Sequence, residues 1–419
     1  MPDAAEALPP ERLIPEPSAN ETGEQSPGTE RLLLVIMAAV FMVSAEARVV
    51  APLLPAVAQD FNTSVPRTGL LITAYTIPYG LFQLIYGPLA DRFSRQRVMG
   101  VALSLFGLGT FVSGFAPSLV ALDLLRLGTG AAAAGVIPVA LAYVGDAIPY
   151  GQRQAALGRV VSIASLGGVL SAALGGLIAT VLSWRAMFLT YGVIAQVVAV
   201  VMLRMPVRRA RPGGPSRRGA FAPYVDLFNL AGRRALALYG LVFVEGLVAT
   251  STVGYLGAFL YERDKLSYAT IGALLTLNGV SSMLTARIVG RLVLRLGERG
   301  MVVTGGIMIV VAYAVLGLRP MPLWFPLGML LGGSGFVIAH STLQTNATEL
   351  VPSLRGTAVA IFAFALFLGG GLGTWIAGLM IDHYGFPVTL AATAFAALVF
   401  AACSWPLINV MQKGGTMGQ

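Results

Sequence analysis

Long apolar runs separated by short polar stretches dominate this chain. Each run approaches the length of about 20 apolar residues that a helix needs to cross a bilayer. The runs lack the alternation of barrel strands, and backbone groups in hydrocarbon must bond within their own segment, so we expect helices. Twelve membrane-spanning helices are predicted, near residues 32–55, 69–87, 98–116, 119–144, 158–181, 186–203, 235–259, 270–289, 301–318, 321–344, 357–380 and 387–408.

The second half of the chain repeats the first at an interval of 203 residues. The segment G-P-L-A-D-R-F-S-R-Q-R, from Gly87 to Arg97, is echoed by G-R-L-V-L-R-L-G-E-R-G, from Gly290 to Gly300. Such an interval is too long for a solenoid unit. We therefore expect an all-α membrane protein of two pseudo-symmetric six-helix bundles. The predicted parts are a disordered tail (1–30), a first bundle (31–204), a linker (205–234), a second bundle (235–408) and a tail (409–419).

Composition and charge agree with a membrane protein. Only 11% of the residues are charged, against about 25% in soluble domains, and 56% are hydrophobic. The net charge of +9 does not indicate nucleic-acid binding, because most Lys and Arg residues fall on one side of the predicted topology. The positive-inside rule places that side, with both termini, in the cytoplasm. We expect a multi-pass protein of a bacterial-type inner membrane, in contact with lipids.

Several classes of protein are not expected. Residues 1–30 lack the apolar core of a signal peptide. The single cysteine, Cys403, permits no intramolecular disulfide and no cysteine-based metal site. Phosphate loops, paired-histidine metal motifs and nucleophile elbows are not found, so we expect no enzyme, no cofactor and no metal. Within the linker, Phe221 to Leu230 could form an amphipathic helix along the membrane surface.

Charges within the apolar runs are the main functional signal, because each is costly unless it is paired or faces water. The first run holds Glu46 and Arg48, which are two residues apart and so point to different sides of a helix. The fourth run holds Asp123 and Arg126, which are three apart and could pair on one face. Either a functional proton site or a static structural ion pair would explain these residues.

The second half contributes another intramembrane acid. Glu245 lies in the seventh run with no cation on the same helix. It would be a protonation site, a binder of a cationic substrate group, or a neutral hydrogen-bonded carboxyl. His340 and Gln344 are one turn apart in the tenth run, where the histidine could titrate near neutral pH or simply pack through hydrogen bonds.

Polar and aromatic side chains could line a substrate cavity. Tyr75, Tyr79 and Gln83 recur every four residues in the second run and so share one helix face. Such a face can hold the apolar body of a ligand while offering hydrogen bonds, although ordinary helix packing explains it equally well. The predicted substrate-cavity residues are Arg48, Tyr75, Tyr79, Gln83, Asn278, His340, Gln344 and Trp375.

The helix count, the duplication and the motif G-x-L-x-D-R-x-x-R together closely resemble the major facilitator superfamily. Further matches are Arg126 with Gly130, the loop D-A-I-P-Y-G-Q-R ending at Arg153, and W-R-A-M-F from Trp184 to Phe188. The resemblance covers about residues 31–408. It implies two bundles that rock about a central cavity, and is closest to the 12-helix drug:proton antiporter type.

The resemblance also assigns a gate to the loop after the second helix. In this family the loop holds the cytoplasmic side closed, with the aspartate near the start of the eleventh helix, here around Gly356 and Thr357. From the residues alone, Gly87 would allow a close helix approach, and the arginines would face lipid headgroups. A plain positive-inside loop is the alternative. The predicted gating residues are Gly87, Asp91, Arg92 and Arg95.

Because Leu294 replaces the aspartate in the second copy, the first loop should be the stronger latch. In drug exporters of this family the fourth-helix arginine lies near the acidic residue of the first helix, here Glu46, nine residues before Pro55. Desolvation favours a neutral carboxyl and a nearby cation favours the charged form, so a movable Arg126 could switch Glu46 between proton uptake and release. The predicted proton-coupling residues are Glu46, Arg126 and Glu245.

One departure weakens the exporter reading. Family antiporters often carry G-x-x-x-G-P-x-x-G-G in the fifth helix, whereas Ser171 and Ala172 stand here in place of Gly-Pro.

Three functions remain possible for the chain. We expect proton-driven export of a small drug-like or metabolite compound, as in multidrug resistance, by a monomer energised by the proton gradient. An importer or lipid translocator, or a scaffold or sensor that transports nothing, are the alternatives.

Overall fold

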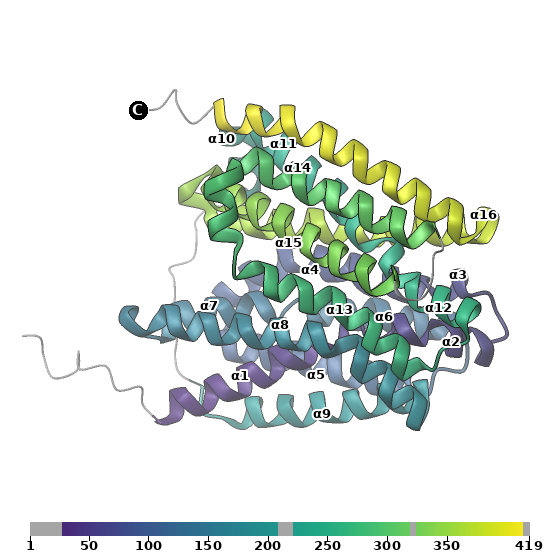
Figure 1. Ribbon diagram of the computed structural model, residues 1–419. Coiled ribbons are helices and arrows are strands. Elements are labelled where there is room, and N and C mark those ends of the chain that lie inside the picture. The colour runs from purple at the N-terminus through teal and green to yellow at the C-terminus, as the bar shows by residue number, and fades with distance from the viewer. Residues whose placement is uncertain (1–26, 208–220, 319–323, 414–419) are drawn as a thin grey trace, which may run out of the picture.

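The computed structural model describes residues 27–207, 221–318 and 324–413, and within these ranges it contains helices and no strands. Eleven helical stretches are long and apolar enough to cross a membrane. The last of them, residues 352–411, holds two spans, because helix α16 (Arg355–Lys413) reverses at Gly385, where φ is +78° (Figure 1). Glycine adopts such a φ without a Cβ clash. The prediction of an all-α fold with twelve spans is confirmed.

The two bundles follow one another along the chain and lie one above the other in Figure 1. The first comprises α1 (Pro27–Glu46), η1 (Ala51–Leu53), α2 (Leu54–Asp60), α3 (Val65–Thr68), α4 (Leu70–Arg92), α5 (Arg95–Ser113), α6 (Leu119–Ala133), α7 (Ile137–Ala147), α8 (Tyr150–Val181) and α9 (Trp184–Arg204). After the linker helix α10 (Ala222–Ala231), the second comprises α11 (Arg233–Thr250), η2 (Thr252–Tyr255), α12 (Leu256–Asp264), α13 (Tyr268–Ala286), α14 (Val289–Gly317), α15 (Trp324–Leu350), η3 (Pro352–Leu354) and α16.

The bundles meet along two helix pairs, α8 with α13 and α4 with α16. Glycines permit the first of these contacts. A Cβ added to Gly176 of α8 would collide with the backbone of Tyr268, and one added to Gly272 of α13 would collide with the backbone of Ala172. Within a bilayer, helices associate mainly through such close packing of small residues.

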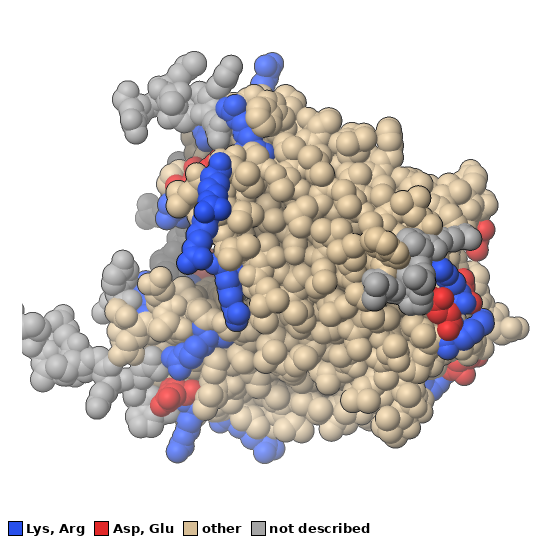
Figure 2. All heavy atoms as spheres, viewed as in Figure 1, with Lys and Arg blue, Asp and Glu red and all other residues tan. Residues whose placement is uncertain are grey.

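Charged residues gather at the two ends of the molecule, with an apolar band between them (Figure 2). One end, which we call the basic end, is where α4 finishes at Arg92, α9 finishes at Arg204 and α11 begins at Arg233. Leucine, valine and phenylalanine side chains are exposed over the outer surface between the ends. A band of this kind is what a bilayer covers, so the chain is a multi-pass membrane protein.

The first helix of each bundle is broken at the same point of the repeat. Helix α1 ends at Glu46 and gives way to a turn at 47–50 before η1 and α2, and α11 ends at Thr250 before η2 and α12. The sequence predicts one unbroken helix in each place. Pro52, which has no N–H to donate, sits at the start of η1. Non-helical backbone at membrane depth occurs where protein buries it or a cavity lies beside it.

Hydrogen bonds join the bundles at the end opposite the basic end. The Gln59 side-chain amide donates to the Tyr261 hydroxyl at 2.9 Å, and the backbone N–H of Ala269 donates to the Thr180 hydroxyl at 2.9 Å. At the basic end, by contrast, a Cβ added to Gly87 of α4 would meet nothing within 4 Å. The bundles are therefore closed together at the opposite end, while the Gly87 face of α4 has no close neighbour at the basic end.

Candidate transport site

A buried ion pair lies where α1 ends. The guanidinium of Arg126, from α6, donates to a carboxylate oxygen of Glu46, and the two side chains are 1% and 0% exposed. Arg126 also donates through Nε to the carbonyl of Leu71 at 3.4 Å, and its guanidinium lies 4.3 Å from the centre of the Tyr75 ring. Two charges withdrawn from water are tolerated here because each has the other as its partner.

This geometry decides between the partners that the sequence left open. Arg126 pairs across helices with Glu46 and not with Asp123 on its own helix. One carboxylate oxygen of Asp123 is buried and has no hydrogen-bond partner among the described residues. The predicted contact between the first and fourth spans is therefore present, and its role in proton coupling remains a prediction.

A second pair lies in the other bundle. Nδ1 of His340, from α15, is 3.4 Å from a carboxylate oxygen of Glu245, from α11. The Glu245 side chain is 0% exposed and that of His340 is 19% exposed. The imidazole stacks on Phe336 with ring centres 4.8 Å apart and meets the edge of Phe362 at 5.2 Å. The sequence identified Glu245 and His340 separately, and the structure brings them together.

The break after α1 has its own hydrogen-bond partner on α8. The Ser171 hydroxyl donates to the carbonyl of Ala45 and accepts from the backbone N–H of Arg48, at 3.1 Å. The Ser171 side chain is fully buried. Sequence reasoning noted this serine only as a departure from Gly-Pro and missed its role. A hydroxyl standing in a run of small residues was the signal that could have found it.

The aromatic side chains of the α4 stripe lead from Arg126 in the first bundle to Phe367 in the other. Tyr75 and Tyr79 are buried and stacked, with ring centres 5.9 Å apart. Tyr79 meets the edge of Phe367, from α16, at 4.7 Å. Gln83, one turn further along, is half-buried. The predicted stripe thus begins beside the Glu46–Arg126 pair and runs along the seam between the bundles.

The remaining cavity predictions are less well placed. Asn278 donates to the carbonyl of Met329 at 3.4 Å, which ties α13 to α15, and Gln344 is exposed. Trp375 was expected to line the cavity, but 45% of its surface is exposed beside exposed Ile376 and Leu379. A contiguous apolar face of this kind belongs to the outer surface that lipids cover, so the assignment of Trp375 to the cavity was wrong.

The loop motif is not latched in this structure. The Asp91 side chain is 73% exposed and lies 3.6 Å from Arg95, which also binds Asp146 at 2.8 Å. No contact of Asp91 with the start of α16 is present among the described residues. The close approach expected at Gly87 is also absent, because a Cβ added there would meet nothing within 4 Å. Arg92, the remaining gating residue, is exposed.

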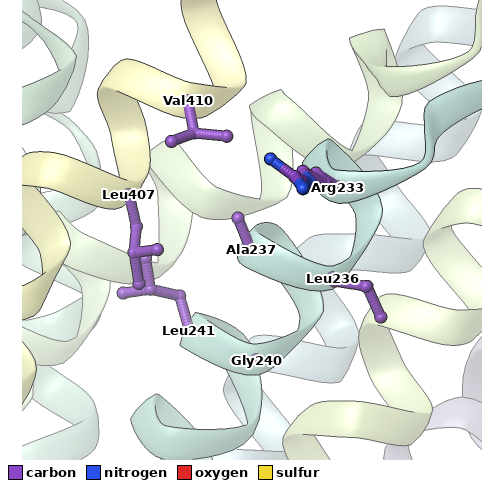
Figure 3. A pocket seen from close by; sticks show the side chains of 7 residues that line it. All are labelled: Arg233, Leu236, Ala237, Gly240, Leu241, Leu407 and Val410. Atoms are coloured by element: carbon purple, nitrogen blue, oxygen red, sulfur yellow. The ribbon is translucent and has the colours of Figure 1, made fainter.

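A shallow groove between α11 and the last turns of α16 is separate from these residues (Figure 3). Leu407 and Val410 face Ala237 and Leu241 across it, and Arg233 lies at its edge. Its lining is almost wholly apolar and includes none of the predicted site residues, so it is not the transport site. Among the described residues, no three His, Cys, Asp or Glu side chains gather as metal ligands would.

Comparison with known proteins settles the family. The model of the Major Facilitator Superfamily matches residues 36–374 and 264–415. This chain belongs to that superfamily. Members of the superfamily are transporters, so the protein is a membrane transporter and not an enzyme.

Relatives within the superfamily include the uncharacterized MFS-type transporter YceJ of Bacillus subtilis, which is 27% identical over 90% of this chain and 95% of its own length. An MFS-type efflux pump of Mycolicibacterium smegmatis is 28% identical over 78% of each chain. Among solved structures, a bacterial homolog of the human lysosomal transporter Spinster, in an inward-facing and unoccupied conformation, has a TM-score of 0.80 at 17% identity and covers 93% of this chain and 99% of its own.

Proposed function

We propose that this transporter exports a small molecule in exchange for protons by alternating access. The observation that carries the proposal is the buried Glu46–Arg126 pair, which joins α1 to α6 beside the break in α1. When a buried acid is paired with a single cation, the uptake of one proton by the acid removes the ion pair.

The pair supplies a physical reason for coupling. If Glu46 takes up a proton, Arg126 keeps its charge in a buried place without a counter-ion, which costs about 3–5 kcal/mol. Asp123 lies one helical turn from Arg126 and offers an alternative acceptor. Protonation would therefore favour a conformation in which Arg126 turns away from Glu46. The proton acts as a ligand that binds this conformation better, so it shifts the population from the paired to the unpaired conformation.

The Glu245–His340 pair is the proposed second proton site. It lies in the other bundle, and its histidine is partly exposed, so that protons can reach the buried carboxylate through the imidazole. The two bundles would then each hold one titratable pair.

Orientation and direction follow from charge and from the closed end. The positive-inside rule places the basic end in the cytoplasm of a bacterial-type inner membrane, with both termini on that side. Since the bundles are closed together at the opposite end, we assign the structure to an inward-facing state, from which an exporter loads its substrate. An efflux pump among the relatives supports this direction.

The proposal is tested with purified protein in vesicles that contain a pH-sensitive dye. A panel of fluorescent aromatic solutes of differing charge is offered under an imposed pH gradient. We expect at least one solute to move in the direction opposite to the protons and to dissipate the gradient as it moves. Movement with the protons would identify an importer, and an absence of gradient-dependent movement for every solute would contradict coupled transport.

A further inference from the structure

Arg48 is an intramembrane cation with no acid beside it. Its guanidinium has no hydrogen bond or ion pair to any described residue, and the nearest acid in sequence, Glu46, is held by Arg126. The side chain is exposed, and it belongs to the turn at 47–50 that interrupts the first span. An exposed and unpaired guanidinium in this turn is accessible to a ligand.

Arg48 lies in the break of the first span. It lies in the turn at 47–50, which interrupts α1 at membrane depth. Directly after this turn, Ala51 and Pro52 pack against Gly257 of α12, where an added Cβ would stand 3.0 Å from the Ala51 carbonyl oxygen. The break therefore borders the seam between the bundles, and in transporters built from repeats such broken helices form the substrate site.

Ser171 fixes the direction in which the chain leaves the helix. The N–H of Val49 bonds to the carbonyl of Glu46 at 3.2 Å, three residues back, so the carbonyl of Ala45 lacks its usual helical donor. Ser171 supplies that donor and also accepts from the N–H of Arg48. One hydroxyl thus satisfies both sides of the break and positions the residue that carries the guanidinium.

The equivalent break in the other bundle also has a hydroxyl bonded to it, but it is uncharged. At the repeat interval, the carbonyl of Ala45 corresponds to that of Val248, which accepts a hydrogen bond from the Tyr313 hydroxyl at 3.1 Å. Ser251 occupies the position equivalent to Arg48. In both breaks a hydroxyl from another helix donates to the equivalent carbonyl, and the second break has no charge at the position of Arg48, so the guanidinium is not a requirement for breaking the helix.

We propose that Arg48 binds an anionic group of the transported molecule, so that the substrate class is organic anions with a carboxylate or a similar acid. An unpaired guanidinium at membrane depth is unfavourable until an anion arrives, and its planar fork of donors matches a carboxylate. Ser171 is the positioning residue. This inference rests on the proposed transport function and names the substrate chemistry for it.

The test compares three probes that share one ring system and differ in charge. They are 1-naphthaleneacetate, its neutral amide and the cationic 1-naphthylmethyl-trimethylammonium, and their binding to purified protein is measured by calorimetry. We expect the wild-type protein to bind the acetate about tenfold more tightly than the amide, and the cation least. Equal affinity for acetate and amide, tighter binding of the cation, or no binding of the acetate would overturn the proposal.

Variants test whether Arg48 causes the tighter binding of the acetate. Arg48→Gln should remove the difference between acetate and amide, whereas Arg48→Lys should keep part of it and so separates charge from folding. Arg291→Gln, at an exposed arginine of the basic end, is the matched control and should leave the preference unchanged. If Arg48→Gln retains the wild-type preference, Arg48 is not the anion site.

The positioning role of Ser171 is tested by separate measurements. Ser171→Ala should weaken the acetate preference while Arg48 is intact, and should speed hydrogen exchange of the backbone N–H groups at 47–50. Ser171→Thr keeps the hydroxyl and should restore both. An unchanged preference and unchanged exchange in Ser171→Ala would remove Ser171 from the account.

These binding experiments need no proton gradient, so the two proposals can fail separately. Anion binding that depends on Arg48, without proton-coupled movement in vesicles, would uphold the site and contradict coupled export. Coupled movement of neutral or cationic solutes that ignores Arg48→Gln would uphold export and contradict the anion site.

Discussion

At the residue scale, the resemblance to drug exporters of this family implied the Glu46–Arg126 contact, while the residues alone left Asp123 open as the partner of Arg126. The structure contains that pair, with both side chains almost completely buried. The contacts of Ser171 and the pairing of Glu245 with His340 were not predicted. Both depend on how helices distant in sequence are rotated against each other, which apolar periodicity does not specify.

The Glu46–Arg126 pair should behave as one unit in stability measurements. Arg126→Gln leaves a buried carboxylate without its cation and should destabilise the folded protein by about 3–5 kcal/mol. Adding Glu46→Gln to that variant removes the orphaned charge and should recover part of the loss. Thermal unfolding of the wild type, both single variants and the double variant measures the coupling, and strictly additive effects would show that the pair does not act as a unit.

At the element scale, hydropathy predicted where the spans lie but not where they break. A window of about 20 residues averages over a four-residue turn, so 32–55 and 235–259 each read as one helix. Pro52 and Pro55 did not show whether the first span is broken, because proline suits the first turn of a new helix as well as a kink. The helix bounds of the structure show that both spans break at equivalent points of the repeat.

The reversal within α16 gives a prediction for an element boundary. At Gly385 the backbone has φ +78° and ψ 172°, a combination open essentially to glycine alone. Gly385→Ala should therefore destabilise the protein by about 1–3 kcal/mol. Gly158→Ala, within α8 and with nothing within 4 Å of the added Cβ, is the control and should be neutral or slightly stabilising. Equal thermal midpoints for the two variants would contradict a strained turn.

At the scale of the whole molecule, duplication and charge asymmetry predicted the two bundles and the basic end. The conformational state was not predictable, because one sequence encodes every state that a transporter visits. Here the bundles meet at the opposite end, and Asp91 contacts Arg95 instead of the start of α16. The latch expected for Asp91 would form in a state in which the basic end is closed, and it stays a prediction.

That difference makes the latch testable. Asp91→Asn should weaken the closed basic end without affecting the present conformation, and so raise the population in which that end is open. Spin labels replacing Arg97 and Arg291, with Cys403 changed to serine, report the distance between the bundles there. Asp382→Asn, at an exposed acid of α16, is the control. An unchanged distance distribution in Asp91→Asn would count against the latch.

The central claim is that a proton on Glu46 drives transport, and substrate-dependent proton movement in vesicles tests it most directly. Glu46→Gln should fold, bind its solute and show no movement driven by the pH gradient. Glu349→Gln, which removes an exposed ion pair with Arg355, should transport as the wild type does. Gradient-driven transport that persists in Glu46→Gln with unchanged proton movement would contradict the account.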